Sequence, residues 1–153
     1  MQQKPNQRLD SVSNSHVGQD FELTVQNFFA GREIRLKRGH AVEIGLREKK
    51  LHRFDIGCDE QKVLVECKAY RWTAGGNDPS AKITTLNQEM LYFLVAPEDY
   101  GKILCIERSV HPRKGSLGRH YVRLKSHLIP DGVEFWEFDL EAQTAEKIYP
   151  ESE

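Results

Sequence analysis

The apolar residues of this chain alternate between helical and strand-like spacing, and this alternation limits the folds open to it more than any other feature. Apolar residues three or four apart predict helices, and those two apart or in short runs predict strands. The predicted helices cover 15–30, 80–96 and 121–128, and the predicted strands cover 41–47, 51–58, 62–70, 103–106 and 133–138. This order predicts an α/β fold, a two-layer or three-layer α/β sandwich with a mixed β-sheet.

The length of 153 residues, with 39% hydrophobic and 29% charged residues, is that of one domain with its own core. The polar residues 1–14 are expected to form a flexible leader and residues 15–153 the domain. The longest apolar run, Leu91–Ala96, is too short to span a bilayer, so no membrane partner is expected. Three cysteines without CxxC spacing argue against a disulfide scaffold or a zinc site, and a cytoplasmic location is expected.

The net charge of −1 hides an uneven distribution of charge along the chain. Lys and Arg outnumber Asp and Glu by 11 to 7 in residues 32–72 and by 7 to 1 in residues 102–127. Residues 131–153 carry 1 basic and 8 acidic side chains. Two basic segments indicate a surface that faces a polyanion, and solvated charged faces without a partner are the alternative.

The second and third predicted strands form a hairpin that carries the clearest chemistry. If its turn lies between positions 60 and 61, Asp55 pairs with Glu66, and alternation places Lys68 on the same face. Two facing carboxylates repel each other unless a cation lies between them, and such an oxygen-rich site suits Mg²⁺ or Mn²⁺. Lys68 would lie beside the ion, where it can orient a water or offset charge on a phosphoryl group. The three residues predict a metal-dependent phosphodiesterase, although Glu-x-Lys alone is also typical of an exposed ion pair.

Asp55, Glu66 and Lys68 together resemble the signature of the PD-(D/E)XK nuclease superfamily, an aspartate on one strand and (D/E)-x-K on the next. Phe54 stands where the family has its proline. The resemblance covers roughly residues 15–140 and implies a restriction-endonuclease-like αβββαβ core. It further implies a Mg²⁺- or Mn²⁺-dependent nuclease, an endonuclease that acts on DNA.

The same resemblance implies further site residues. Glu22, in the first predicted helix, would contact the metal through a water, and the backbone carbonyl of Cys67 would bind it directly. Gln88 and Tyr92 are four residues apart in the second helix, similar to the Q-x-x-x-Y element of exonuclease-like members, which makes Gln88 a candidate catalytic residue. An ordinary helix glutamate in solvent is the alternative for Glu22.

Basic side chains near the triad and in a loop are predicted to contact nucleic-acid phosphates. These candidates are Lys49, Lys50, Arg53, Arg71, Arg113, Lys114 and Arg119. Trp72 would either stack on a base or cap the edge of the sheet. Two functions remain open: a metal-dependent endonuclease, with a homodimer expected if both strands are cut, and a catalytically inactive nucleic-acid-binding or partner-binding module on the same fold.

Overall fold

The computed structural model describes residues 14–151. The predicted leader lies outside these residues except at Asn14, where the first helix begins. The helices are α1 (Asn14–Ala30), α2 (Ser80–Leu94), α3 (Leu117–Lys125) and the 3₁₀ turn η1 (Ser126–Leu128). The strands are β1 (Lys37–Ile44), β2 (Lys50–Cys58), β3 (Val63–Lys68), β4 (Gly101–Glu107), β5 (Val110–His111), β6 (Gly115–Ser116), β7 (Val133–Asp139) and β8 (Thr144–Tyr149).

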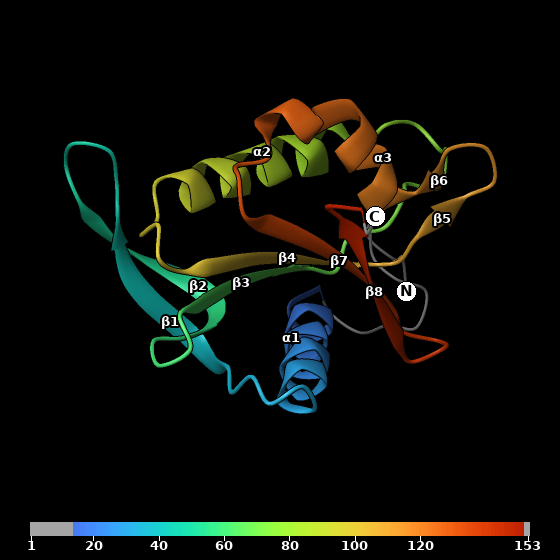
Figure 1. The fold of residues 1–153 in the computed structure, drawn as a ribbon. Helices are drawn as coiled ribbons and strands as arrows, with labels where there is room; N and C mark the ends of the chain where they lie inside the picture. Colours follow the sequence, from blue (N-terminus) through green and yellow to red (C-terminus); the bar gives the residue numbers. More distant parts are fainter. Residues whose placement is uncertain (1–13, 152–153) are drawn as a thin grey trace.

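Six strands form one mixed sheet in the order β1-β2-β3-β4-β7-β8, and β5 and β6 form a separate hairpin. Neighbours are antiparallel at β1–β2, β2–β3 and β7–β8, and parallel at β3–β4 and β4–β7. Helix α1 lies against one face of the sheet, and α2 and α3 lie against the other (Figure 1). The α/β class and the mixed sheet are therefore confirmed, with three layers.

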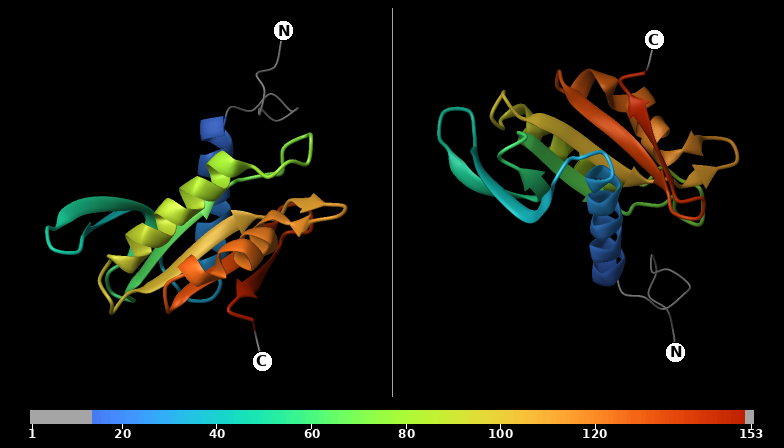
Figure 2. Two further views of the ribbon diagram at one scale, coloured as in Figure 1. Left: turned by 90° about the horizontal axis from the view of Figure 1, so that it is seen from above. Right: turned by 60° about the horizontal axis from the view of Figure 1, so that its bottom comes forward.

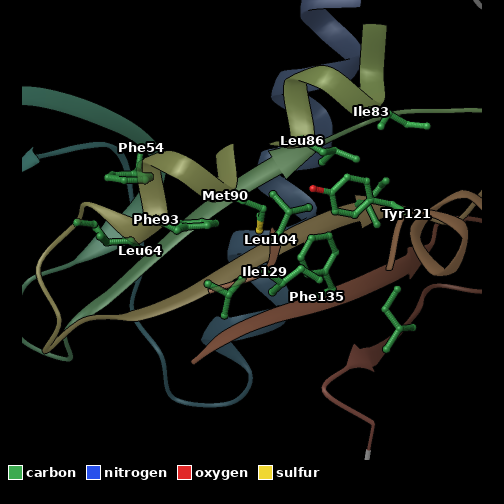
Figure 3. Close-up of a cluster of buried hydrophobic side chains, with 14 of the residues drawn as sticks. Phe54, Leu64, Ile83, Leu86, Met90, Phe93, Leu104, Tyr121, Ile129 and Phe135 are labelled. Carbon is green, nitrogen blue, oxygen red and sulfur yellow. The ribbon is translucent and has the colours of Figure 1, made fainter. Parts of the chain in front are cut away.

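The sheet separates two apolar cores. Helix α2 contributes Ile83, Leu86, Met90 and Phe93 to the core on its own side (Figure 3). Helix α1 contributes Phe21, Val25 and Phe29 to the core on the opposite side. Leu94 is exposed, whereas its neighbour Phe93 is buried and stacks on Phe54 of β2. Helices α1 and α2 are therefore amphipathic, and each packs one apolar stripe against the sheet.

Two predicted element boundaries are wrong, and a glycine explains each. The strand predicted at 41–47 lies at Lys37–Ile44 and stops before Gly45, whose φ of +141° is open to glycine alone. The helix predicted at 121–128 begins four residues earlier, at Leu117, and Ser116 caps it by accepting a hydrogen bond from the Arg119 backbone N–H. Gly118 lies inside that helix because a Cβ there would come within 2.8 Å of Glu137 Oε2.

Strands β5, β6 and β8 have no counterpart among the predicted elements. Strand β8 pairs with β7 at an edge of the sheet, and Ile148 is its one fully buried apolar residue in the described structure. A strand of this kind has too little apolar alternation to be recognised. None of the helices in the described part of the chain is long and apolar enough to cross a membrane.

Candidate active site

The β2–β3 hairpin has the register that the sequence predicted. Ile56 pairs with Val65 and Cys58 with Val63, and the same register places Asp55 opposite Glu66. The Asp55 backbone N–H donates to Glu66 Oε1 at 3.1 Å. In return, Asp55 Oδ2 accepts a hydrogen bond from the Cys67 backbone N–H at 2.8 Å. The two carboxyl groups are therefore fixed side by side at the point where β2 and β3 separate.

Asp55 itself lies at a break in the alternation of β2. Phe54 belongs to the core under α2, whereas Ile56, two residues further on, belongs to the core under α1. Residues two apart in a regular strand face the same side, so the strand changes face at Asp55. On β1, Gly39 lies across from this point with a φ of +64°. The irregularity lets the Asp55 side chain reach residues from both faces of the sheet.

Lys68 lies on the α2 side of the sheet, where it contacts two carboxylates. Its Nζ atom is 3.8 Å from Glu66 Oε2 and 3.3 Å from Glu89 Oε1. Glu89, on α2, is buried, and its second oxygen, Oε2, has no hydrogen-bond partner. Sequence reasoning missed Glu89, although it interrupts the apolar stripe between Leu86 and Phe93. A charged residue in the buried stripe of a helix is the signal that could have found it.

Glu22 reaches the same cluster from α1, on the opposite face of the sheet. Its carboxyl group shares a hydrogen bond with that of Asp55. Burial and the charge of Asp55 raise the pKa of Glu22, and the nearby Arg38 opposes this shift. The structure thus places Glu22 near Asp55, with its side chain half-buried rather than free in solvent.

The cluster holds more negative charge than its one buried cation can balance. Burial, then the charges of Asp55 and Glu89, raise the pKa of Glu66 to about 10. Burial lowers the pKa of Lys68, but neighbouring negative groups, led by Glu89, outweigh it, and the net pKa is raised. Lys68 therefore stays charged while Glu66 holds a proton at neutral pH.

This charge excess and the donor types fit a divalent cation. Buried carboxylate oxygens are the ligands that Mg²⁺ and Mn²⁺ prefer, and the unpartnered Oε2 of Glu89 leaves an acceptor unused. The geometry is not that of a formed site, because residues 14–151 contain no group of three or more His, Cys, Asp or Glu side chains placed to hold a metal ion. A cation would have to draw the carboxylates closer together.

Gln88 is not brought to the cluster. Its amide donates a hydrogen bond of 2.8 Å to the Tyr92 hydroxyl on the exposed side of α2, so the two residues contact each other rather than the triad. The inward position next to it is occupied by Glu89. The i, i+4 spacing lets the two side chains meet, but the helix turns the pair away from Asp55 and Glu66.

A cavity of about 620 Å³ opens beside Lys68. It lies between the end of β3, the start of α2 and the N-terminal turns of α1. Its polar lining includes Lys68, Arg71, Thr73, Asp78, Ser80 and Lys82. Cys67 and Lys68 line this hollow, which is large enough for part of a substrate and has three cationic side chains on its wall, whereas Asp55, Glu66 and Glu89 do not line it.

Most of the basic side chains in residues 71–119 that were predicted to contact nucleic acid form ion pairs within the protein. The ion pairs are Arg71 with Glu107, Lys114 with Asp78, and Arg119 with Glu137 and Glu146. Trp72 donates from Nε1 to the Gly115 carbonyl and packs against the core under α2, which favours its role as a cap. Arg113 is exposed, as are Lys49, Lys50 and Arg53 on β1–β2 and its turn.

A scan against protein-family models finds no match to this sequence, and neither curated proteins nor solved structures give one.

Proposed function

We propose that this protein is a metal-dependent nuclease that hydrolyses phosphodiester bonds, an endonuclease acting on DNA. One observation carries the proposal: Asp55 and Glu66 are locked together across β2 and β3 by two hydrogen bonds, with Lys68 Nζ 3.8 Å from Glu66 Oε2. Two carboxylates and an amine in this order are the minimal set for holding a divalent ion next to a phosphate and its attacking water.

The order and connection of the elements support the same proposal. Helix α1, the antiparallel β1–β2–β3 meander, the crossover helix α2 and the parallel strand β4 follow one another in the αβββαβ order of a restriction-endonuclease-like core. The triad lies in the middle of this arrangement, between α1 and α2. Resemblance of a motif is stronger support when the strands that carry it also occupy the expected positions.

In this proposal Asp55, Glu66 and the Cys67 carbonyl would hold the Mg²⁺ or Mn²⁺ ion. When bound, the ion would lower the pKa of a water and offset charge on the phosphoryl group. Lys68 orients the attacking water or stabilises the charge that develops on phosphorus. Glu22 accepts a hydrogen bond from a water next to Asp55, and Glu89 holds Lys68 in place from α2.

Cleavage of labelled plasmid, flap and junction DNA with Mg²⁺ or with chelator tests the proposal. Asp55→Asn is expected to abolish both metal binding and cleavage, because the ion loses one of few anionic ligands. Lys68→Ala is expected to keep metal binding, measured by calorimetry, but to slow cleavage at least a hundredfold. Asp131→Asn, a change of the same type at an exposed turn, serves as the control.

Wild-type cleavage that requires Mg²⁺ and is fully retained by both site variants would contradict the proposed roles of Asp55 and Lys68. A wild-type protein that binds DNA but cleaves none of these substrates would favour the binding module on the same fold instead.

A further inference from the structure

Strands β1 and β2 extend beyond the rest of the sheet as a two-stranded arm. Strand β2 pairs with β3 only at Ile56–Cys58, whereas its pairing with β1 continues to Lys50. Residues 37–54, here called the β1–β2 arm, therefore project from the body of the fold (Figures 1 and 2). The arm leads directly into Asp55, so anything that binds along it lies next to the candidate active site.

One face of this arm is fixed to α2. The His52 ring packs on Tyr92, with centroids 4.2 Å apart, and Phe54 stacks on Phe93 at 5.6 Å. At the turn, the Gly45 backbone N–H donates to the Val95 carbonyl just after α2. These contacts hold the arm rigidly, so its opposite face keeps a defined shape without help from a partner.

The opposite face of the arm is bare. Alternation places Leu51 and Arg53 on it, because His52 and Phe54 point to α2. Leu51 is 66% exposed, and Leu46, in the turn, is 79% exposed. Helix α1 lies on this side of the sheet over β2 and β3, and it meets β1 at Arg38, which donates to the Gln19 carbonyl, away from Leu51 and the turn. A rigid surface with exposed leucines and no cover is typical of an interaction site.

The charge of the arm distinguishes it from the second basic segment. The arm carries six basic residues, Lys37, Arg38, Arg47, Lys49, Lys50 and Arg53, against two acidic residues, Glu43 and Glu48. Within residues 14–151 none of the six forms an ion pair with a carboxylate, and all six are exposed. Arg71, Arg108, Lys114 and Arg119 are instead neutralised by acidic side chains. The arm thus keeps a net positive charge, although exposed basic residues such as Arg113 and Arg123 also lie elsewhere in the described chain.

We propose that the bare face and turn of the β1–β2 arm bind the phosphate backbone of duplex DNA and guide it to Asp55. Unpaired Lys and Arg side chains on an exposed ribbon attract phosphates without reading sequence. An eight-residue strand spans about 26 Å, so a phosphate backbone along the arm can meet Arg47 and Lys49 at the turn and Arg53 on the bare face near Asp55. The inference deepens the proposed nuclease function, because it names the substrate surface and its duplex form.

The absence of exposed rings on this part of the arm favours a duplex over a single strand. Proteins that hold single strands use aromatic side chains on which bases stack. Of the arm's three aromatic rings, His52 and Phe54 are packed against α2 and His40 is held by Asp59 at 2.7 Å, and the bare face presents Ala41, Glu43, Leu51 and Arg53. A two-stranded ribbon also matches the width of the DNA major groove, and an exposed leucine such as Leu46 suits contact with the groove rather than with phosphates.

Binding measured in chelator tests this inference separately from catalysis. The test variant replaces Arg47 and Lys49 of the turn and Arg53 of the bare face with serine. The matched control replaces Arg123, Lys125 and Lys147 with serine, which removes the same charge near the opposite edge of the sheet. Fluorescence anisotropy with labelled duplex and single-stranded DNA at several salt concentrations gives the affinity and its salt dependence, and circular dichroism confirms folding.

The arm variant is expected to bind duplex roughly ten- to a hundredfold more weakly, with a salt slope reduced by about 2 to 3, and the control to bind like the wild type. Equal losses in both variants, or no loss in the arm variant, would overturn the proposal. Tighter binding of single strands, or binding of anionic phospholipid vesicles in place of DNA, would overturn it as well. Since no metal is present, loss of cleavage has no bearing on these outcomes, and intact binding without cleavage would count against the proposed nuclease function alone.

Discussion

Replacement of Glu66 by glutamine is expected to stabilise the fold in the absence of metal. Burial and the negative charges of Asp55 and Glu89 raise the pKa of Glu66 to about 10, so the folded protein holds a proton there that the unfolded chain loses near pH 4.5. Because the folded state binds more protons, the free energy of unfolding falls as pH rises from about 4.5 to about 10. Glutamine mimics the protonated carboxyl group and still accepts from the Asp55 backbone N–H.

The size of the effect follows from the pKa difference. The loss of stability is about 1.4 kcal/mol for each pH unit above 4.5, which amounts to about 3 kcal/mol at pH 7. The Glu66→Gln variant avoids this loss, and its melting temperature at pH 7 is expected to be higher by roughly 6–12 °C. Urea and thermal denaturation in chelator at pH 6, 7 and 8, followed by circular dichroism, measure both quantities.

Two comparisons make the result specific to this cluster. Glu48→Gln removes the same charge from an exposed turn and is expected to change stability by less than about 0.5 kcal/mol. Added Mg²⁺ is expected to stabilise the wild type, since the ion replaces the proton, and to have little effect on Glu66→Gln. A Glu66→Gln variant no more stable than the wild type, or a difference that stays constant with pH, would refute the excess of negative charge on which this reasoning depends.

Two further predictions concern the packing that positions the site. Gly118→Ala should lower the free energy of unfolding by about 1–3 kcal/mol in urea denaturation, because its Cβ would lie 2.8 Å from Glu137 Oε2. Gly18→Ala, in α1 with no atom within 4 Å, should raise it by about 0.5–1 kcal/mol. Equal effects would contradict the close packing of α3. Tyr121→Phe should cost about 1 kcal/mol by leaving Asn87 Oδ1 without its 2.8 Å hydrogen bond, and an unchanged denaturation midpoint would show that water replaces it.

The hairpin at the centre of the candidate site could be predicted from the sequence because local rules determine it. Apolar residues on both sides of a short polar turn allow one register that buries them, and that register fixes the position of Asp55 against Glu66. What alternation could not give is the change of face at Asp55. That irregularity depends on Phe54 packing against α2 and Ile56 against α1, which are contacts between segments distant in the sequence.

The features that sequence reasoning missed share this dependence on distant contacts. Glu89 belongs to the site only because the inward face of α2 lies over Lys68. The basic segment 102–127 looked like a nucleic-acid surface because its carboxylate partners, such as Glu137 and Glu146, lie elsewhere in the chain. A count of charges along the sequence cannot show which of them neutralise one another in the folded protein.

The positive charge of the β1–β2 arm and the negative charge of the carboxylate cluster link DNA binding to cleavage. The positive charge of the β1–β2 arm attracts a phosphate backbone, but at Asp55 the same strand enters a cluster of carboxylates that repels it. Without a divalent cation, a duplex held by the arm would be kept away from the cluster. Binding of the cation would offset most of the local negative charge and weaken this repulsion, so the ion that the proposed hydrolysis requires would also complete the path of the substrate. Asp55→Asn, which relieves part of the repulsion, should therefore bind DNA in chelator at least as tightly as the wild type while it cleaves none.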